Sequence, residues 1–147
     1  MEQILYGAPV AKQLDEISLK IFQEVKSNNK TPHMTAITVG DNPASLLYVS
    51  RKKEKAEELG VEFNWIKLDK NTSQEKLKEL VETESKNTHG LIIQLPLPDH
   101  LSSEDVINCI PPDVDVDGLT SYNLGGLFSN EYKLIPATSL AVLELLN

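Results

Sequence analysis

The sequence predicts an α/β domain of three layers, with helices on both faces of a mostly parallel sheet. Three observations support this prediction. Segments with helical and with strand-like patterns alternate along the chain. The stretch "HGLIIQLPLP" begins with a run that is apolar without a break, which is typical of a central parallel strand covered on both faces. The length of 147 residues corresponds to one domain, so we expect residues 1–147 to form a single unit.

The first half of the chain is expected to contain two helices and two strands. Apolar residues recur at helical spacing through 10–28, which predicts an amphipathic helix, and Pro9 suits its first turn. Residues 33–40 form a short apolar run and predict a buried strand. The loop "GDNPAS" then leads into a helix over about 45–59, which a glycine follows. Residues 61–68 alternate and are rich in β-formers, so they predict a second strand.

The second half continues the alternation. A Ser/Thr cap opens a helix within 72–87. The third strand lies within 89–98, and its prolines end it because they have no N–H for a ladder. A short capped helix is expected within 102–110, and the stretch 111–126 is expected to be turn-rich. Residues 136–147 predict a last helix, in or at the end of which the sequence stops.

Composition narrows the classes of function. The net charge is −8 with a pI near 4.8, which argues against nucleic acid, because phosphate contacts need clustered Lys and Arg. No signal peptide is visible at the start, and no apolar run approaches the ~20 residues that a bilayer-spanning helix needs. A single cysteine indicates a reducing compartment. We therefore expect a cytoplasmic protein with neither a nucleic acid nor a membrane as partner.

Tyr48 and Lys52 lie four residues apart on the second predicted helix, so they share one face. A lysine held near apolar groups or another cation can have its pKa lowered and can then serve as a general acid or base. The tyrosine could stack on a flat ligand. The alternative is an ordinary solvated face, because this spacing is common on helices.

Polar groups also follow the third strand. Gln94 lies at its carboxyl end, where its amide could bind a lysine or a substrate, or simply face solvent. Asp113, Asp115 and Asp117 form a D-x-D-x-D-G run that lacks the later glutamate of a calcium loop. Such carboxylates could hold the N–H groups of a heterocycle, or the run could be a polar turn.

Other motifs are absent or uninformative. The three histidines have no helical metal spacing and are interpreted as surface or turn residues: His33, His89 and His100. No G-x-G-x-x-G, G-x-S-x-G or Walker motif occurs in the 147 residues, so no dinucleotide fingerprint is present. Cys109 lies in the apolar context "INCIPP" and is interpreted as a packed small hydrophobe. No metal is expected.

Four motifs then fall in a known order: "VGDNPASLLYVSRKKEKAEELG", "GLIIQLPLPDH", "PPDVDVDGLTSYNLGGL" and "IPATSLAVLELL". The sequence resembles the N-terminal catalytic domain of the bifunctional methylenetetrahydrofolate dehydrogenase/methenyltetrahydrofolate cyclohydrolase family, over essentially its whole length. The opening "ILYGAPVAKQLDEI" is similar to the first strand and helix of that family.

The resemblance implies roles for individual residues. Lys52 would be the key catalytic residue, and Tyr48 would pack against the aromatic part of a folate. Gln94 would hydrogen-bond Lys52 and help set its protonation, while Asp117 would hold the pterin ring. The substrate-binding set implied is Tyr48, Lys52, Gln94, Leu95, Pro96 and Asp117, of which the catalytic residues are Lys52, Tyr48 and Gln94.

The resemblance also implies a reaction and a cofactor. Methylenetetrahydrofolate would lose a hydride to NADP, and water would open the resulting methenyl cation to 10-formyltetrahydrofolate, with Lys52 moving protons in the second step. NADP would be held mainly by a second, glycine-rich domain that these 147 residues do not include, so a truncated form without dehydrogenase activity and with an exposed apolar patch is expected. A homodimer is expected for the full-length protein.

The sequence departs from the family pattern at three positions. Tyr6 stands in place of an aspartate in the opening motif, and Ala137 and Ser139 replace the Cys and Pro of a "PCTP" motif. These departures keep a second interpretation open, namely a catalytically silent folate-binding or interaction module of the same fold. A third, the substrate domain of another two-domain dehydrogenase of the shikimate or amino-acid type, is disfavoured by the motifs.

Overall fold

The computed structural model describes residues 4–146. Three parallel strands form its sheet: β1 (His33–Val39), β2 (Glu62–Leu68) and β3 (Gly90–Ile93). Their order in the sheet is β2-β1-β3, with β1 in the centre. Residues 1–3, at the start of the predicted domain, and residue 147, at the end of the predicted last helix, lie outside the described residues.

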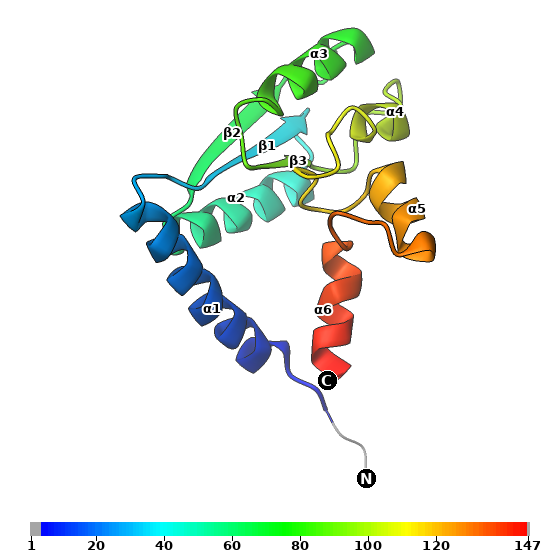
Figure 1. Cartoon of the computed structure of the whole chain (residues 1–147). Coiled ribbons are helices and arrows are strands. Elements are labelled where there is room, and N and C mark those ends of the chain that lie inside the picture. Colours follow the sequence, from blue (N-terminus) through cyan, green and yellow to red (C-terminus); the bar gives the residue numbers. More distant parts are fainter. Residues whose placement is uncertain (1–3, 147) are drawn as a thin grey trace.

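Helices cover both faces of this sheet (Figure 1). On one face lies α2 (Pro43–Glu58), whose Val49 packs with Ala36 and Ile92 of the sheet. On the other face lie α3 (Gln74–Glu84) and α4 (Ser103–Ile107). The predicted three-layer α/β class with a parallel sheet is therefore confirmed.

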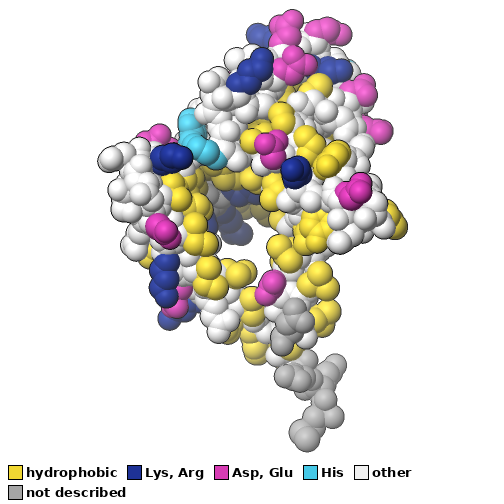
Figure 2. Space-filling model, viewed as in Figure 1, with side chains coloured by type: hydrophobic (Ala, Val, Ile, Leu, Met, Phe, Trp, Pro, Cys, Tyr) yellow, Lys and Arg dark blue, Asp and Glu magenta, His cyan; other side chains and the backbone are white. Residues whose placement is uncertain are grey.

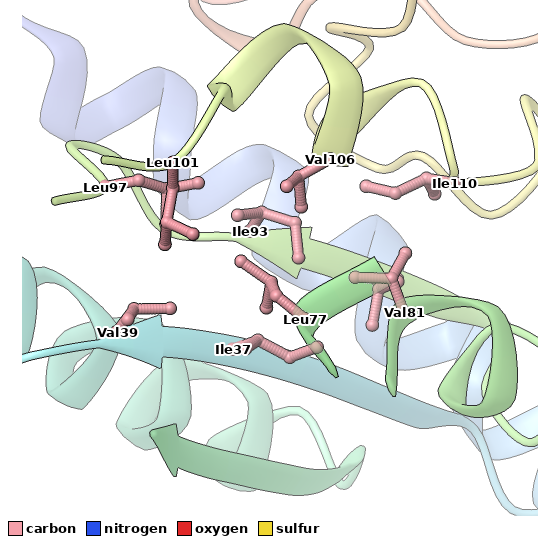
Figure 3. Close-up of a cluster of buried hydrophobic side chains, with 10 residues drawn as sticks. Ile37, Val39, Leu77, Val81, Ile93, Leu97, Leu101, Val106 and Ile110 are labelled. Atoms are coloured by element: carbon pink, nitrogen blue, oxygen red, sulfur yellow. The ribbon is translucent and has the colours of Figure 1, made fainter. Parts of the chain in front are cut away.

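The larger core lies between the sheet and α3 with α4 (Figure 3). Leu77 and Val81 of α3 are one turn apart and both fully buried. They meet Ile37 of β1 and Ile93 of β3, which pair with each other across the sheet. Alternate residues of β1 point to opposite faces, so this one strand contributes to both clusters.

Two helices stand away from the sheet. These are α1 (Gly7–Ser27) and α6 (Ala137–Leu146), which approach each other below it in Figure 1. Neither buries a residue completely. Large apolar side chains on both are exposed, among them Leu14, Ile17 and Leu143. The expected apolar patch is therefore assigned to these two helices as a prediction, which their exposed side chains support.

Two predictions about elements were wrong. The resemblance implied a first strand at the opening "ILYGAPVAKQLDEI", but residues 4–6 form no strand and α1 already begins at Gly7. The stretch predicted to be turn-rich contains a helix, α5 (Ser121–Ser129). Its two glycines lower helix propensity, but Thr120 caps it, and a Cβ at Gly126 would come within 2.8 Å of the Tyr132 nitrogen. Close packing therefore requires glycine there, and it overrides propensity.

No helix within residues 4–146 has both the length and the apolar character that a membrane crossing demands.

The burial pattern predicts where the stability of the domain resides. Leu77→Ala should lower the free energy of unfolding by about 2–5 kcal/mol, because it leaves a cavity in the main core. The matched control is Ile17→Ala on α1, where the side chain is 55% exposed and the change should be within about 0.5 kcal/mol. Urea denaturation monitored by the single tryptophan measures both. Similar losses in the two variants would contradict this assignment of the core.

Candidate active site

Three segments meet near the carboxyl ends of the strands, which is where ligands bind in open α/β sheets. The loop after β1 leads into α2, and Gln94 directly follows β3. The turn containing Asp115 lies beside β3, where Asp115 forms a parallel bridge with Leu91. The fold therefore brings the helix, the strand end and the acidic turn together, although they are far apart in the sequence.

The start of α2 is fixed by its own loop. The side chain of Asn42 accepts hydrogen bonds from the backbone N–H groups of Ala44 and Ser45, and Pro43 occupies the first turn. The Ser45 hydroxyl donates to the carbonyl of Leu95 at 3.2 Å. This bond ties the helix that carries Lys52 to the segment that follows Gln94.

Lys52 lies between an amide and a carboxylate. Its Nζ donates to Oε1 of Gln94 at 3.3 Å and lies 3.7 Å from Oδ2 of Asp117. The side chains of Lys52 and Asp117 are 33% and 29% exposed, so the pair is neither free in solvent nor sealed inside. A ligand can reach both groups.

Gln94 is held from both sides. Its backbone N–H donates to the carbonyl of Ile37, and its side-chain Nε2 donates to the carbonyl of Leu95 at 2.9 Å. Because Nε2 is used in this way, Oε1 is the atom left to accept from Lys52. The strand end therefore fixes the orientation of the amide that the lysine contacts.

The acidic run divides into a buried and an accessible carboxylate. Asp115 is buried, and its Oδ2 accepts from the Thr120 N–H at 2.8 Å and from Asn123 Nδ2 at 3.0 Å. Asp117, two residues on, faces Lys52. Gly118, the residue after Asp117, has a φ of +67°, a conformation that favours glycine. A Cβ at this position would also lie 2.7 Å from the backbone nitrogen of Pro136.

Asn123 holds this turn in place, and the sequence analysis did not single it out. Its Nδ2 also donates to the carbonyl of Pro112, and its Oδ1 accepts from the backbone N–H groups of Lys133 and Leu134. It is fully buried and joins three segments. The only sequence signal was its place three residues after Thr120, the spacing of a helix cap.

A cavity of about 750 Å³ opens beside the cluster. Tyr48, Lys52 and Gln94 line it, and it extends along α2 to Phe22 of α1 and to the starts of β1 and β3. In Figure 2 a hollow between α1 and α6 is surrounded by hydrophobic side chains, with basic side chains visible behind it. Tyr48 is 55% exposed, which leaves its ring open to a ligand.

Not every predicted site residue lines that cavity. Leu95, Pro96 and Asp117 are outside its wall, although Val116 is part of it. Asp117 joins the cluster through Lys52, and Leu95 joins it through its carbonyl, which accepts from Gln94 and Ser45. Pro96 follows Leu95 across a cis peptide bond.

The remaining candidates have local partners. His89 Nδ1 accepts from the His33 backbone N–H at 3.2 Å, and His100 Nε2 lies 3.0 Å from the Thr72 carbonyl oxygen. Within residues 4–146 no group of three or more side chains is placed to hold a metal ion. Burial raises the pKa of the Cys109 thiol, which donates to the carbonyl of Asp105.

The site has a lysine between an amide and a carboxylate, and it lies at the carboxyl ends of a parallel α/β sheet. A cavity with an exposed tyrosine opens beside it. These features define a ligand-binding domain with the groups for acid–base chemistry. The family can be stated more closely. Residues 5–117 match the model for the "Tetrahydrofolate dehydrogenase/cyclohydrolase, catalytic domain". The chain belongs to this family, as its motifs predicted.

Known proteins agree with this assignment. The chain is 39% identical over 146 residues to "Bifunctional protein FolD" of Bacillus pumilus, covering 98% of this chain and 52% of that protein. The crystal structure of FolD from Campylobacter jejuni is 34% identical with a TM-score of 0.91, over 95% of this chain and 51% of that one. FolD of Trypanosoma brucei, complexed with NADP and an inhibitor, is 29% identical with a TM-score of 0.89, over 99% and 52%. The chain thus spans about half the length of the relatives it matches.

The Asn123 network makes a prediction about stability. Asn123→Ala leaves the buried Asp115 with one partner and removes the acceptor of two backbone N–H groups, so unfolding should be easier by about 2–4 kcal/mol. The control is Asn87→Ala, which removes one exposed side-chain bond to the Thr83 carbonyl and should cost less than about 1 kcal/mol. Urea denaturation of both variants is the measurement, and equal losses would show that the network is not structural.

The Cys109 thiol makes a prediction about pH. Burial raises the pKa of the thiol above its ordinary value of 9.0. At about pH 8 the fraction of Cys109 present as thiolate is therefore smaller in the folded chain than in the unfolded chain. Alkylation by iodoacetamide should therefore be slower in the folded chain, and its rate should rise at higher pH than in urea. A folded rate equal to or above the unfolded rate would contradict the effect of burial.

Proposed function

We propose that residues 1–147 form the folate-binding catalytic domain of a bifunctional enzyme of one-carbon metabolism. Its reactions are the oxidation of methylenetetrahydrofolate to methenyltetrahydrofolate and the hydrolysis of that product to formyltetrahydrofolate. The observation that carries the proposal is the contact of Lys52 with both Gln94 and Asp117 beside a ligand-sized cavity. Family membership supports the choice of folate as the ligand.

Each residue has a role that its position supports. Tyr48 stacks on the aromatic part of the folate, and Asp117 accepts hydrogen bonds from the pterin. Leu95 and Pro96 border the ring, next to the amide of Gln94. In the hydrolytic step water attacks the methenyl carbon and loses a proton, and a ring nitrogen gains one as the ring opens. Lys52 carries that proton movement, with Gln94 orienting its amine.

The carboxylate of Asp117 can offset the repulsion between the Lys52 amine and a cationic intermediate. The methenyl form is a cation, and a protonated lysine alone would repel it. Asp117 lies 3.7 Å from the Lys52 amine, so its negative charge offsets that repulsion locally. The ion pair lets a basic side chain work beside a cationic substrate.

NADP is the cofactor that we propose for the oxidative step, since a relative of this chain is known as a complex with it. The 147 residues contain no G-x-G-x-x-G loop, and the cavity wall holds no glycine-rich turn. We therefore assign NADP binding mainly to residues outside this chain. Cytoplasmic location, the absence of nucleic-acid and membrane partners, and a homodimer of the full-length protein remain predictions.

The second candidate is a catalytically silent module that binds folate through the same site. Ala137 and Ser139 favour it, because they alter the segment next to the acidic turn, where the Ala137 N–H donates to the Asp117 carbonyl. The two candidates differ in one measurable respect, namely turnover of methenyltetrahydrofolate by this chain.

Substitutions at the cluster test the proposal. Lys52→Met should lower the rate of methenyltetrahydrofolate hydrolysis about 100-fold or more, because it removes the proton-carrying group.

Asp117→Asn should weaken binding of folic acid about tenfold, measured by calorimetric titration. Lys53→Met is the matched control, since Lys53 lies on the same helix outside the cavity wall and pairs with Glu57.

The outcomes separate the candidates. Binding without hydrolysis in the unaltered chain would favour the silent module. Normal turnover of Lys52→Met would remove the catalytic role of the lysine, and no binding of folic acid by the unaltered chain would overturn the function as a whole.

A further inference from the structure

The cavity beside Lys52 has a lining of one sign of charge. Its wall includes three basic side chains, two histidines and no carboxylate. The chain as a whole has the opposite balance, with 22 acidic and 14 basic residues. A cleft lined by one sign of charge attracts ligands of the other sign. The lining therefore favours an anionic ligand.

The three basic side chains differ in how their charges are balanced. Lys52 has the acidic partner described above, and Lys55 is paired with Asp15 at 3.0 Å and with Glu58 at 2.7 Å. Arg51, in contrast, forms no ion pair or side-chain hydrogen bond with any of residues 4–146. Its guanidinium is the group of the wall that is left to bind an anion from outside.

The place of Arg51 on α2 fixes which part of a ligand it can reach. It follows Tyr48 by three residues, so their Cβ atoms are neighbours about 5–6 Å apart on the helix surface, and both side chains line the cavity. A ring stacked on Tyr48 therefore brings its substituents within reach of Arg51. Guanidinium groups bind carboxylates through two parallel hydrogen bonds.

We propose that Arg51 binds a carboxylate of the glutamate tail of folate, so that this site selects folates with a glutamate tail over a pteroyl amide that lacks the tail and its carboxylates. The inference rests on the proposed function, because it assumes that a folate ring lies on Tyr48. It adds a subsite to that function: one end of the ligand meets Asp117 and Lys52, and the other end meets Arg51.

Two ligands that differ only in the tail test the subsite. Folic acid and pteroyl amide, in which a neutral carboxamide stands in place of the glutamate tail, are titrated into the 147-residue chain, into Arg51→Ala and into Lys53→Ala. Each variant removes one positive charge from the same helix, but Lys53 lies outside the cavity wall and is paired with Glu57. Arg51→Ala should weaken folic acid about 3- to 10-fold, since the lost ion pair is partly exposed, and leave pteroyl amide within about twofold, since it has no carboxylate to lose. Lys53→Ala should leave the ratio of the two affinities unchanged.

A conservative variant adds a second readout. Arg51→Lys keeps the charge but loses the two-pronged geometry, so it should restore part of the preference for folic acid. An unchanged ratio of folic acid to pteroyl amide affinity in Arg51→Ala would overturn the inference and leave the proposed function standing. If the unaltered chain bound neither ligand, the proposed function would fail and the inference with it.

Discussion

The contact of one amine with two partners is the interaction on which the site depends. Lys52 comes from α2, Gln94 from the end of β3 and Asp117 from the acidic turn, and the three meet at the amine of Lys52. A hydrogen bond of 3.3 Å and an ion pair of 3.7 Å, both part-exposed, contribute little to stability. Their geometry is therefore maintained by the surrounding fold, and the free energy that holds them must come from elsewhere.

Buried polar groups supply that support on one side and the sheet supplies it on the other. The turn carrying Asp117 is fastened by Asp115 and Asn123, whose bonds are shielded from water and thus more costly to break than surface bonds. The backbone of β3 fastens Gln94 through its bond to Ile37. Lys52 can remain accessible because rigid neighbours on both sides fix where its partners lie.

The sequence predicted much of this and missed parts of it for definable reasons. The three strands and the helices beside them follow from apolar periodicity, and the Tyr48–Lys52 face follows from helical spacing. The split between Asp115 and Asp117 could not be read from a D-x-D-x-D pattern, because burial is decided by the contact with Asn123, which comes from the next helix. α5 was missed since Gly125 and Gly126 suggested a turn, whereas packing against residues 131–132 requires a glycine. The first strand that the resemblance implied at the opening motif is not formed by residues 4–6, which pair with none of the three strands of the sheet.

A net charge of −8 and an anionic ligand are compatible once distance is considered. At physiological ionic strength charges more than about 8 Å apart on the surface are largely screened. An anion approaching the cavity therefore responds to the groups of its wall, which carry basic side chains and no carboxylate, rather than to the whole chain. Lys52 and Lys55 have acidic partners, so the attraction centres on Arg51. Raised salt weakens such an attraction but not contact with an aromatic ring, so Arg51 and the exposed ring of Tyr48 offer a ligand two physically separable kinds of contact.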